Sequence, residues 1–288
     1  MGGKKIICFF KSYWLLIKPR QTFLLTYSAV SAMLAASSTV ILSSLLWILV
    51  SSIFGIAGAT AITNYIDRDI DGVMVRTRTR PLPSHRLNPP SKALCFGIIL
   101  IVVSIILAFK INIWFLIFLL LGIINSTVIY NFWLKRRSPF NIFFASPTAA
   151  MPILGGWSAV STISLSPILM AFLTMIWIPI HVWSLVLKWR EDYVNAKIPM
   201  LPLHVDGGKL IVYFSLLLAG YSLLITPFLM RSLISYIIII LLNFILVILS
   251  LRLRTDTNRN MWLFFKYTSP YIAAIYTLWL VDSYLPKF

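Results

Sequence analysis

Long apolar stretches separated by short polar segments dominate the pattern of this chain. A helix needs about 20 apolar residues to cross the roughly 30 Å hydrocarbon core of a bilayer. The pattern predicts nine transmembrane helices, near residues 21–39, 43–63, 93–109, 112–132, 141–161, 166–187, 209–229, 233–251 and 267–285. It therefore indicates an all-α polytopic membrane protein built as a bundle of nine transmembrane helices.

Two places depart from this regular alternation. The fifth predicted helix contains Pro147, Pro152, Gly155 and Gly156, and we expect it to be kinked or broken because an internal proline removes a backbone hydrogen bond. The connections between helices are short except for residues 64–92, a stretch of about 29 residues after the second helix. Connections of that length inside a compact domain are commonly functional, so we expect this loop to contribute to function.

Composition supports a membrane protein and limits its partners. Hydrophobic residues make up 59% and charged residues 11% of the 288 positions, and the mean hydropathy is +0.90, more apolar surface than a soluble domain of this size could bury. The net charge is +17, but the basic residues lie between apolar stretches, which indicates membrane topology and argues against a nucleic-acid partner. We expect one membrane domain, residues 1–288, in contact with the lipid bilayer.

Lysine and arginine residues distinguish the two sides of the predicted bundle. Of 25 such residues, 22 fall on one side and only Lys110, Arg231 and Lys287 fall on the other. Positive residues concentrate in cytoplasmic loops. We therefore expect a multi-pass protein of the cell (plasma) membrane with its N-terminus and the loops after helices 2 and 6 in the cytoplasm, and its C-terminus outside.

Three of the 8 acidic residues lie close together directly after the second predicted helix, in the stretch TNYIDRDIDGVMVRTRTRPLP that begins at Thr63. If the helix continues through this stretch, Asn64, Asp67 and Asp71 share one face, and Asp69 points elsewhere. A small converging set of oxygen ligands suits Mg²⁺, which commonly shares its shell with substrate phosphates.

Arginines follow this acidic cluster at alternate positions, Arg76, Arg78 and Arg80. Their planar guanidinium groups match phosphate oxygens, so carboxylates, a cation and arginines together indicate a diphosphate site. The alternative is a solvated interfacial loop whose arginines only set topology, but topology gives no reason to concentrate acids beside them.

A second cluster lies after the sixth predicted helix, in HVWSLVLKWREDY. His181, Lys188 and Asp192 are spaced by seven and four residues and would share one helical stripe. Lys188 and Asp192 could also form a surface ion pair. His181 lies in an apolar run, where an ionisable residue faces the bundle interior; it is a structural histidine, a ligand or a proton carrier. Lys135 and Arg136, after the fourth helix, lie on the same side.

These segments resemble the UbiA-type intramembrane prenyltransferase superfamily, whose members carry aspartate-rich motifs on cytoplasmic loops after the second and sixth of nine helices. The segments NYIDRDIDGVMVRTRTRPLP, LKRRSPFN, PILGGW and HVWSLVLKWREDYVNAKIPMLP, with KPRQT from Lys18, are similar to the branch that farnesylates protoheme IX. Most other branches place an aspartate pair in the last segment, whereas this chain has Lys188 at the first position and Asp192 at the second. Thr63 stands where the superfamily usually has asparagine.

The resemblance implies roles for individual residues. It implies Mg²⁺ held by Asn64, Asp67, Asp71 and Asp192, and catalytic roles for Asp67, Asp71, Lys188 and Asp192. It implies that the diphosphate is bound by Arg76, Arg80, Lys135, Arg136 and Lys188. His181 and Arg20 would contact the heme.

The implied activity is transfer of the farnesyl group of farnesyl diphosphate to a vinyl group of heme B, with addition of water, to give heme O for heme-copper oxidases. Contact with heme A synthase or oxidase assembly machinery would follow. Alternatives are prenyl transfer to a quinone precursor or glyceryl phosphate lipid, membrane transport, and a non-catalytic assembly role. The gathering of charges at one membrane face and the odd helix count argue against a transporter with paired inverted halves.

Overall fold

The computed structural model describes residues 2–37, 39, 42–255 and 258–285, with the side chains of residues 2–8, 254 and 255 left out. These residues form helices and connecting segments without a β-strand. The elements are α1 (Gly2–Leu16), α2 (Pro19–Ala36), α3 (Leu42–Ile66), α4 (Arg68–Val73), α5 (Ser91–Phe109), α6 (Ile113–Ile124), η1 (Asn125–Leu134), α7 (Asn141–Ala145), α8 (Pro147–Ser158), α9 (Leu165–Lys188), α10 (Arg190–Asn195), η2 (Leu201–Leu203), α11 (Gly207–Leu229), α12 (Leu233–Leu251), η3 (Arg252–Thr255) and α13 (Asn258–Ser283).

Helical segments lie over every range in which the sequence predicts a transmembrane helix. Within the described residues, six helical stretches are long and apolar enough to cross a membrane: α3, α5, α6 with η1, α9, α11 and α12. The structure therefore shows an all-helical, multi-pass protein with six candidate spans. Lys287 and the C-terminal end, used above to assign orientation, lie outside the described residues.

The fifth predicted helix is broken, as expected from its prolines. Helix α7 ends at Ala145 and α8 begins at Pro147, because proline lacks the N–H that would continue the helical hydrogen bonds. Pro152, in contrast, lies inside α8. The long connection after α3 contains the short helix α4 and a series of turns rather than an irregular loop.

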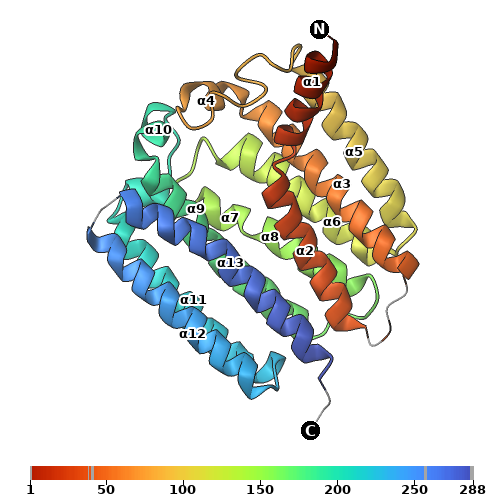
Figure 1. The fold of residues 1–288 in the computed structure, drawn as a ribbon, viewed down its shortest axis with the longest axis vertical. Coiled ribbons are helices and arrows are strands. Elements are labelled where there is room, and N and C mark those ends of the chain that lie inside the picture. Colours follow the sequence, from red (N-terminus) through yellow and green to blue (C-terminus); the bar gives the residue numbers. More distant parts are fainter. Residues whose placement is uncertain (1, 38, 40–41, 256–257, 286–288) are drawn as a thin grey trace.

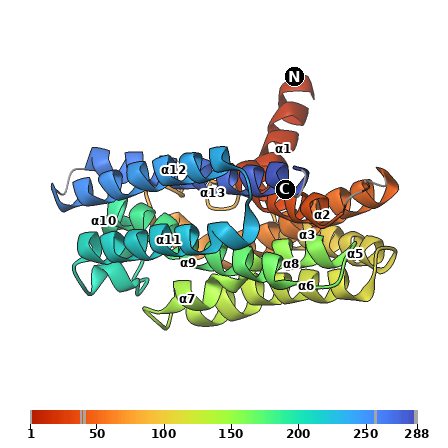
Figure 2. The same cartoon turned by 90° about the horizontal axis from the view of Figure 1, so that it is seen from below.

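Two helical features were not expected from the sequence. Helix α1 precedes the first predicted span and projects from the body of the bundle (Figure 2). The second half of the fourth predicted helix, η1, is a π-helix, a form that is rare and frequently found at functional sites.

Close packing of small residues joins α3 and α5. Ser51 and Ser104 donate their hydroxyls to each other's backbone carbonyl oxygens, at 2.9 and 2.7 Å. About two turns after Ser51 in α3, a Cβ added at Gly58 would lie 2.7 Å from the carbonyl oxygen of Gly97 in α5. Small residues and hydroxyl hydrogen bonds are the usual means of helix association in membranes, where apolar side chains face lipid as readily as protein.

The other half of the bundle packs α9, α11, α12 and α13 around large buried aromatic side chains, among them Trp183, Tyr271 and Trp279. Several buried polar groups there are satisfied within the protein, as the absence of water in a bilayer favours, whereas the indole N–H of Trp183 has no hydrogen-bond partner among the described residues. Asp282, near the end of α13, accepts hydrogen bonds from the amides of Arg231 and Ser232 and so holds the start of α12. This acid therefore has a structural role.

The segments that carry the two acidic clusters meet at one end of the bundle. Helices α4 and α10 lie towards the same end of the ribbon, the upper end in Figure 1, at which α1 also lies. Four more helix termini lie at this end, and each adjoins a polar segment: the start of α2 and the ends of α3, η1 and α9. The fold thus brings polar segments from across the sequence to one place.

Candidate functional site

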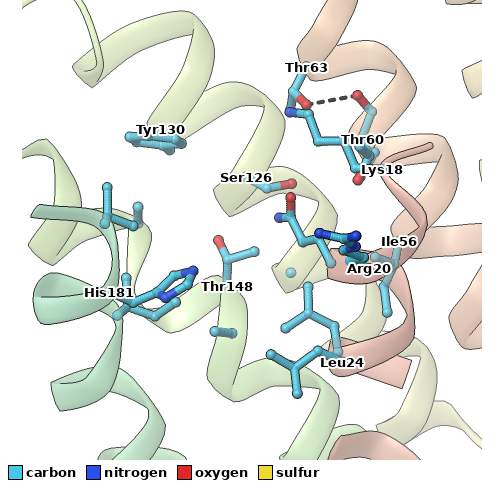
Figure 3. Close-up of a pocket in the computed structure, with 18 of the residues that line it drawn as sticks. Lys18, Arg20, Leu24, Ile56, Thr60, Thr63, Ser126, Tyr130, Thr148 and His181 are labelled. Atoms are coloured by element: carbon cyan, nitrogen blue, oxygen red, sulfur yellow. Dashed lines mark hydrogen bonds between the residues drawn. The ribbon is translucent and has the colours of Figure 1, made fainter. Parts of the chain in front are cut away.

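A cavity of about 1390 Å³ lies inside the bundle. It is larger than most small-molecule sites, which measure about 300–1,000 Å³. Its lining includes apolar side chains of α2, α3, α6, α8, α9 and α13. The polar and charged residues in the lining include Lys18, Arg20, Thr63, Asp67, Asp71, Arg76, Arg80, Ser126, Tyr130, Asn131, Lys135, Thr148, His181 and Lys266. Figure 3 shows Lys18 and Arg20 across the cavity from His181.

Thr63, Asp67 and Asp71, four residues apart, supply the acidic side of this cavity. The structure does not place the predicted ligand Asn64 among them, and its Oδ1 is buried without a hydrogen-bond partner among the described residues. Asn64 is outside the lining, and its amide donates to the carbonyl oxygen of Leu16 at 2.6 Å. Positions 63, 67 and 71 follow one another at four-residue spacing along the cavity wall, whereas the amide of position 64 is turned towards Leu16.

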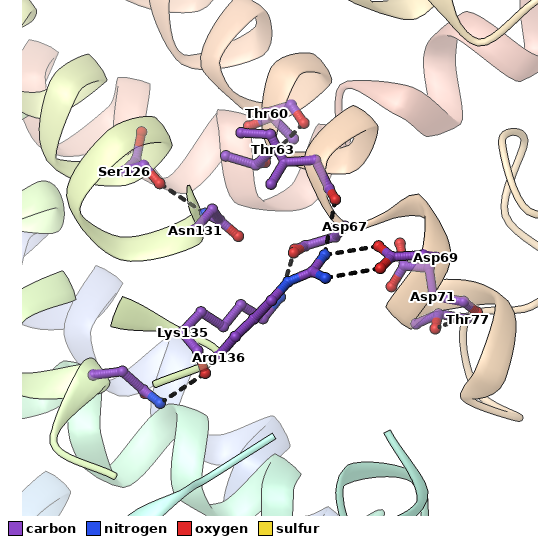
Figure 4. A network of polar contacts seen from close by, with 12 residues as sticks. Thr60, Thr63, Asp67, Asp69, Asp71, Thr77, Ser126, Asn131, Lys135 and Arg136 are labelled. Atoms are coloured by element: carbon purple, nitrogen blue, oxygen red, sulfur yellow. Dashed lines mark hydrogen bonds and ion pairs between the residues drawn. The ribbon is translucent and has the colours of Figure 1, made fainter. Parts of the chain in front are cut away.

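Asp67 forms a buried ion pair at the end of α3. Its Oδ2 lies 2.5 Å from Nζ of Lys135, and the two side chains are 8% and 14% exposed (Figure 4). Burial alone would lower the pKa of Lys135, but the charge of Asp67 and their hydrogen bond offset this, so the pKa lies above its usual value. Lys135 is therefore charged at neutral pH and belongs to the predicted cationic set.

Asp71 is also buried and is held by the loop that follows it. Arg80 donates Nη1 to both carboxylate oxygens, at 3.0 and 2.8 Å, and the Thr77 hydroxyl donates to the backbone carbonyl of Asp71 at 3.0 Å. The turns between α4 and α5 thus bring Arg80 back to the acidic residues from which it is nine positions distant.

Asp69 points out of the cavity, as predicted, and takes Arg136 with it. Arg136 donates to both carboxylate oxygens, at 2.8 and 2.7 Å, and the two side chains are 40% and 61% exposed (Figure 4). The hydrogen bond from Arg136 lowers the pKa of Asp69. Arg136 is absent from the cavity lining, so the structure does not bring this predicted diphosphate ligand to the site. Lys135 points inward, and its neighbour Arg136 points outward.

Asp192 joins the second acidic cluster to the first through the backbone. Its two oxygens accept the amides of Val75 and Arg76, each at 2.9 Å. This contact leaves Asp192 outside the lining but holds Arg76 within it. Nε of Arg76 is buried and has no hydrogen-bond partner among the described residues, which leaves it available to an anion in the cavity.

The predicted stripe of His181, Lys188 and Asp192 does not form. Helix α9 ends at Lys188, Trp189 is non-helical, and α10 begins at Arg190, so the helical register from His181 to Asp192 is interrupted. Lys188 is outside the lining, with its ammonium 6.0 Å from the ring centroid of Trp189. The four ion pairs among the described residues do not include Lys188 with Asp192. The surface ion pair considered above is therefore not formed.

Lys18 is a cavity residue that sequence reasoning missed. It precedes α2 in the left-handed backbone conformation, φ 46°, which turns the chain between α1 and α2. Burial and the charge of Arg80 lower its pKa to about 7. The signal in the sequence was the KPRQT segment, where a lysine directly precedes a proline-initiated helix. Arg20, the other predicted heme contact besides His181, is exposed and lies in the lining.

The acidic side of the cavity fits a divalent cation. Oδ1 of Asp67 is buried without a hydrogen-bond partner among the described residues, and Asp71 lies one turn further along the same wall. The described residues contain no group of three His, Cys, Asp or Glu side chains placed to hold a metal. Two carboxylates suffice for Mg²⁺, which keeps several waters and takes further ligands from substrate phosphates.

Comparisons with known proteins agree with this architecture. The chain is 37% identical to protoheme IX farnesyltransferase of Desulforudis audaxviator over 96% of this chain and 89% of that protein. It is 35% identical to protoheme IX farnesyltransferase of Thermoplasma volcanium over 93% and 96%.

Two solved structures share the fold at low sequence identity. A structure of digeranylgeranylglyceryl phosphate synthase superposes with a TM-score of 0.76 at 17% identity, covering 96% of this chain and 98% of that one. A UbiA homolog from Archaeoglobus fulgidus bound to DMAPP and Mg²⁺ gives 0.69 at 15% identity, covering 93% and 98%. The model of the UbiA prenyltransferase family matches residues 23–278. The chain therefore belongs to the UbiA prenyltransferase family.

Proposed function

We propose that this chain transfers the farnesyl group of farnesyl diphosphate to a vinyl group of heme B, with addition of water, and releases heme O and diphosphate. One observation carries the proposal. A single large cavity combines buried carboxylates and cations at one end of the bundle with an apolar lining elsewhere. An isoprenoid diphosphate has the same two parts. Relatives named protoheme IX farnesyltransferase, matched over most of their length, support heme as the acceptor.

Asp67 and Asp71 would hold Mg²⁺, which would neutralise negative charge on the diphosphate. Around them, Lys18, Arg76, Arg80 and Lys135 supply positive charge to the diphosphate as the bond to farnesyl C1 breaks and its electrons pass to the leaving oxygen. Preorganised charges at the place where charge develops lower the barrier. Asp192, also a predicted ligand, acts through the backbone of Arg76. Lys188 and Arg136 lie outside the cavity lining and do not contact the diphosphate in this proposal.

The terminal carbon of the heme vinyl group attacks farnesyl C1, and the carbon next to the porphyrin becomes cationic. Water captures that carbon and gives up a proton, which leaves a hydroxyl group. Bulk water must not reach the cationic carbon before this step. The apolar walls from α2, α6 and α8 exclude bulk water from the cavity. His181 and Arg20 are the candidate heme contacts at this cavity.

The same proposal includes the arrangement in the membrane. All nine predicted helices cross the bilayer of the cell membrane as one domain, and the end of the bundle with α4 and α10 faces the cytoplasm, where farnesyl diphosphate is available. The excess of lysine and arginine on that side supports this orientation. Contact with heme A synthase or oxidase assembly machinery stays a prediction.

The test is turnover by the full-length protein in detergent, with heme B, farnesyl diphosphate and Mg²⁺, followed by mass analysis of the porphyrin. We expect a product heavier by farnesyl plus water. Asp67→Asn should lower its rate at least about 100-fold because a charge beside the diphosphate is lost. Asp69→Asn is the matched control, since Asp69 belongs to the same motif but points out of the cavity.

Two results would contradict the proposal. Release of diphosphate with unchanged heme, and prenyl transfer to an aromatic acid or glyceryl phosphate instead, would show that the acceptor is wrong. Equal damage by Asp67→Asn and Asp69→Asn, with both variants as thermally stable as the parent, would show that the site is wrong.

A further inference from the structure

The imidazole of His181 is enclosed in a column of stacked rings between α9 and α13. Its ring centroid lies 4.7 Å from that of Trp177 and 4.6 Å from that of Phe265, with interplanar angles of 20° and 21°. Trp262 continues the column beyond Phe265, at 5.4 Å and 14°. Both faces of the imidazole are therefore covered, and only its edge can meet a ligand.

One edge nitrogen of His181 is already engaged. Nδ1 lies 2.8 Å from the hydroxyl oxygen of Thr268, and this hydroxyl donates its one hydrogen to the carbonyl oxygen of Phe265 at 2.8 Å. A threonine hydroxyl has a single hydrogen, so towards His181 it can only accept. On this ground we assign the proton of the neutral ring to Nδ1, which leaves a lone pair on Nε2.

Thr268 is held rigidly enough to fix this tautomer. Its side chain is fully buried, and its backbone carbonyl accepts the indole N–H of Trp177 at 2.7 Å. Trp177 and His181 are one turn apart on α9, so α9 contacts Thr268 through two hydrogen bonds. Movement of the imidazole would break both the hydrogen bond and the stacking.

The free nitrogen of His181 meets the cavity. His181 lines the cavity beside Ile178 and Val182 and is seen facing it in Figure 3. Nε2 has no hydrogen-bond partner among the described residues, and it is not one of their fully buried unpaired atoms. An accessible lone pair on a ring of fixed orientation is the arrangement of a metal-binding histidine, whose other nitrogen usually donates to an acceptor.

We propose that Nε2 of His181 coordinates the iron of the heme substrate, and that Thr268 is the positioning residue that fixes the required tautomer. The inference rests on the proposed function and deepens it. The geometry opposes two other roles. Stacking of His181 on the porphyrin is blocked because both imidazole faces are occupied, and a propionate would need an N–H at Nε2.

The first experiment measures binding to the full-length protein in detergent, without farnesyl diphosphate, by the absorption spectrum of ferric protoheme IX. Metal-free protoporphyrin IX serves as the second probe. We expect His181→Ala to shift the Soret band and to weaken protoheme binding at least about tenfold, without changing affinity for protoporphyrin IX. Added imidazole should restore the parent spectrum. His204→Ala, at an exposed loop position, is the histidine control.

The second experiment tests Thr268. Thr268→Val keeps the shape but removes the acceptor of the Nδ1 hydrogen, so we expect protoheme affinity to fall about tenfold and the iron–nitrogen stretching frequency to change. Thr268→Ser should restore both.

Three results would overturn the inference. Identical protoheme spectra and affinities in the parent and His181→Ala would exclude ligation while leaving the proposed function intact if farnesylation persists. Equal losses for protoheme and protoporphyrin IX would assign His181 to shape alone. Failure of the parent to bind protoheme would remove the proposed function as well.

Discussion

Folding strongly lowers the pKa of Lys18, which lines the cavity. Its pKa falls from 10.5 to about 7. Between about pH 7 and 10.5 the unfolded chain therefore binds a proton that the folded chain lacks, and stability rises with pH. Below about pH 7 both states carry the proton, and the folded state bears the full cost of a charge removed from water. Such an unfavourable charge suits a site whose ligand is an anion.

Replacement of Lys18 by methionine tests this account. The Lys18→Met variant should unfold at a higher temperature than the parent at about pH 6, and the difference should shrink as the pH rises towards about 10. Thermal unfolding in detergent across that range measures it. Lys11→Met, at an exposed position of α1, is the control. Parallel pH profiles for the parent and Lys18→Met would contradict the prediction.

Individual residues also show the limit of sequence reasoning. The carboxylates Asp67 and Asp71 were found because acids are rare in this chain and their spacing of four fits one helical face. Lys18 was missed because a lone lysine before a helix looks like a topology signal. Which of two neighbours, such as Lys135 and Arg136, points inward depends on how a helix ends, and the sequence pattern does not specify that.

At the scale of helices, packing distance decides where a side chain is tolerated. Helix α8 approaches α2 so closely that a Cβ added at Gly156 would overlap the carbonyl oxygen of Ala29. This contact keeps α2 against α8 and so positions the cavity wall that contains Leu24. The backbone of α2 cannot move away without disturbing its other contacts.

Alanine substitutions at two glycines should separate packing from helix propensity. Gly156→Ala should destabilise the protein by about 1–3 kcal/mol, the usual cost of overpacking, and lower its thermal midpoint. Gly220→Ala, in α11 where an added Cβ meets nothing within 4 Å, should be neutral or stabilise by up to about 1 kcal/mol. Equal midpoints for the two variants would show that α2 can relax away from α8.

Most helices could be predicted because a bilayer forces long apolar runs into helices. The break at Pro147 follows from the chemistry of proline in the same way. The π-helical η1 and the interruption at Trp189 could not be predicted, since both depend on tertiary contacts and leave the hydrophobic pattern unchanged. The interruption matters most, because it separates Asp192 from the helix that carries His181 and Lys188.

For the whole molecule, the contact between Asp192 and residues 75 and 76 joins segments more than 100 positions apart. It connects the cluster after α9 to the loop after α4 and so couples the two halves of the bundle. Asp192 holds the backbone of Arg76, whose side chain lines the cavity, while Thr77 and Arg80 hold the same loop to Asp71. The two acidic clusters therefore act as one unit although only the first lines the cavity.

Amide hydrogen exchange can measure that coupling. In Asp192→Ala the amides of Val75 and Arg76 lose a charged acceptor, and we expect them to exchange about tenfold faster or more. The KM of Asp192→Ala for farnesyl diphosphate should also rise, because Arg76 is no longer held in the cavity. Glu191→Ala, at the exposed neighbouring position, should change neither quantity. Unaltered exchange at both amides in Asp192→Ala would mean that the loop keeps its path without this contact.

The contact made by Asp192 also restricts how the chain can evolve. A carboxylate that binds main-chain amides constrains the length and path of its partner segment but leaves the side chains there free to vary. Val75 can be exchanged for almost any residue except proline, which has no amide hydrogen to give. An insertion or deletion between Asp71 and Arg80 would shift the register of both amides, so selection should remove it although much of this segment lies on the surface.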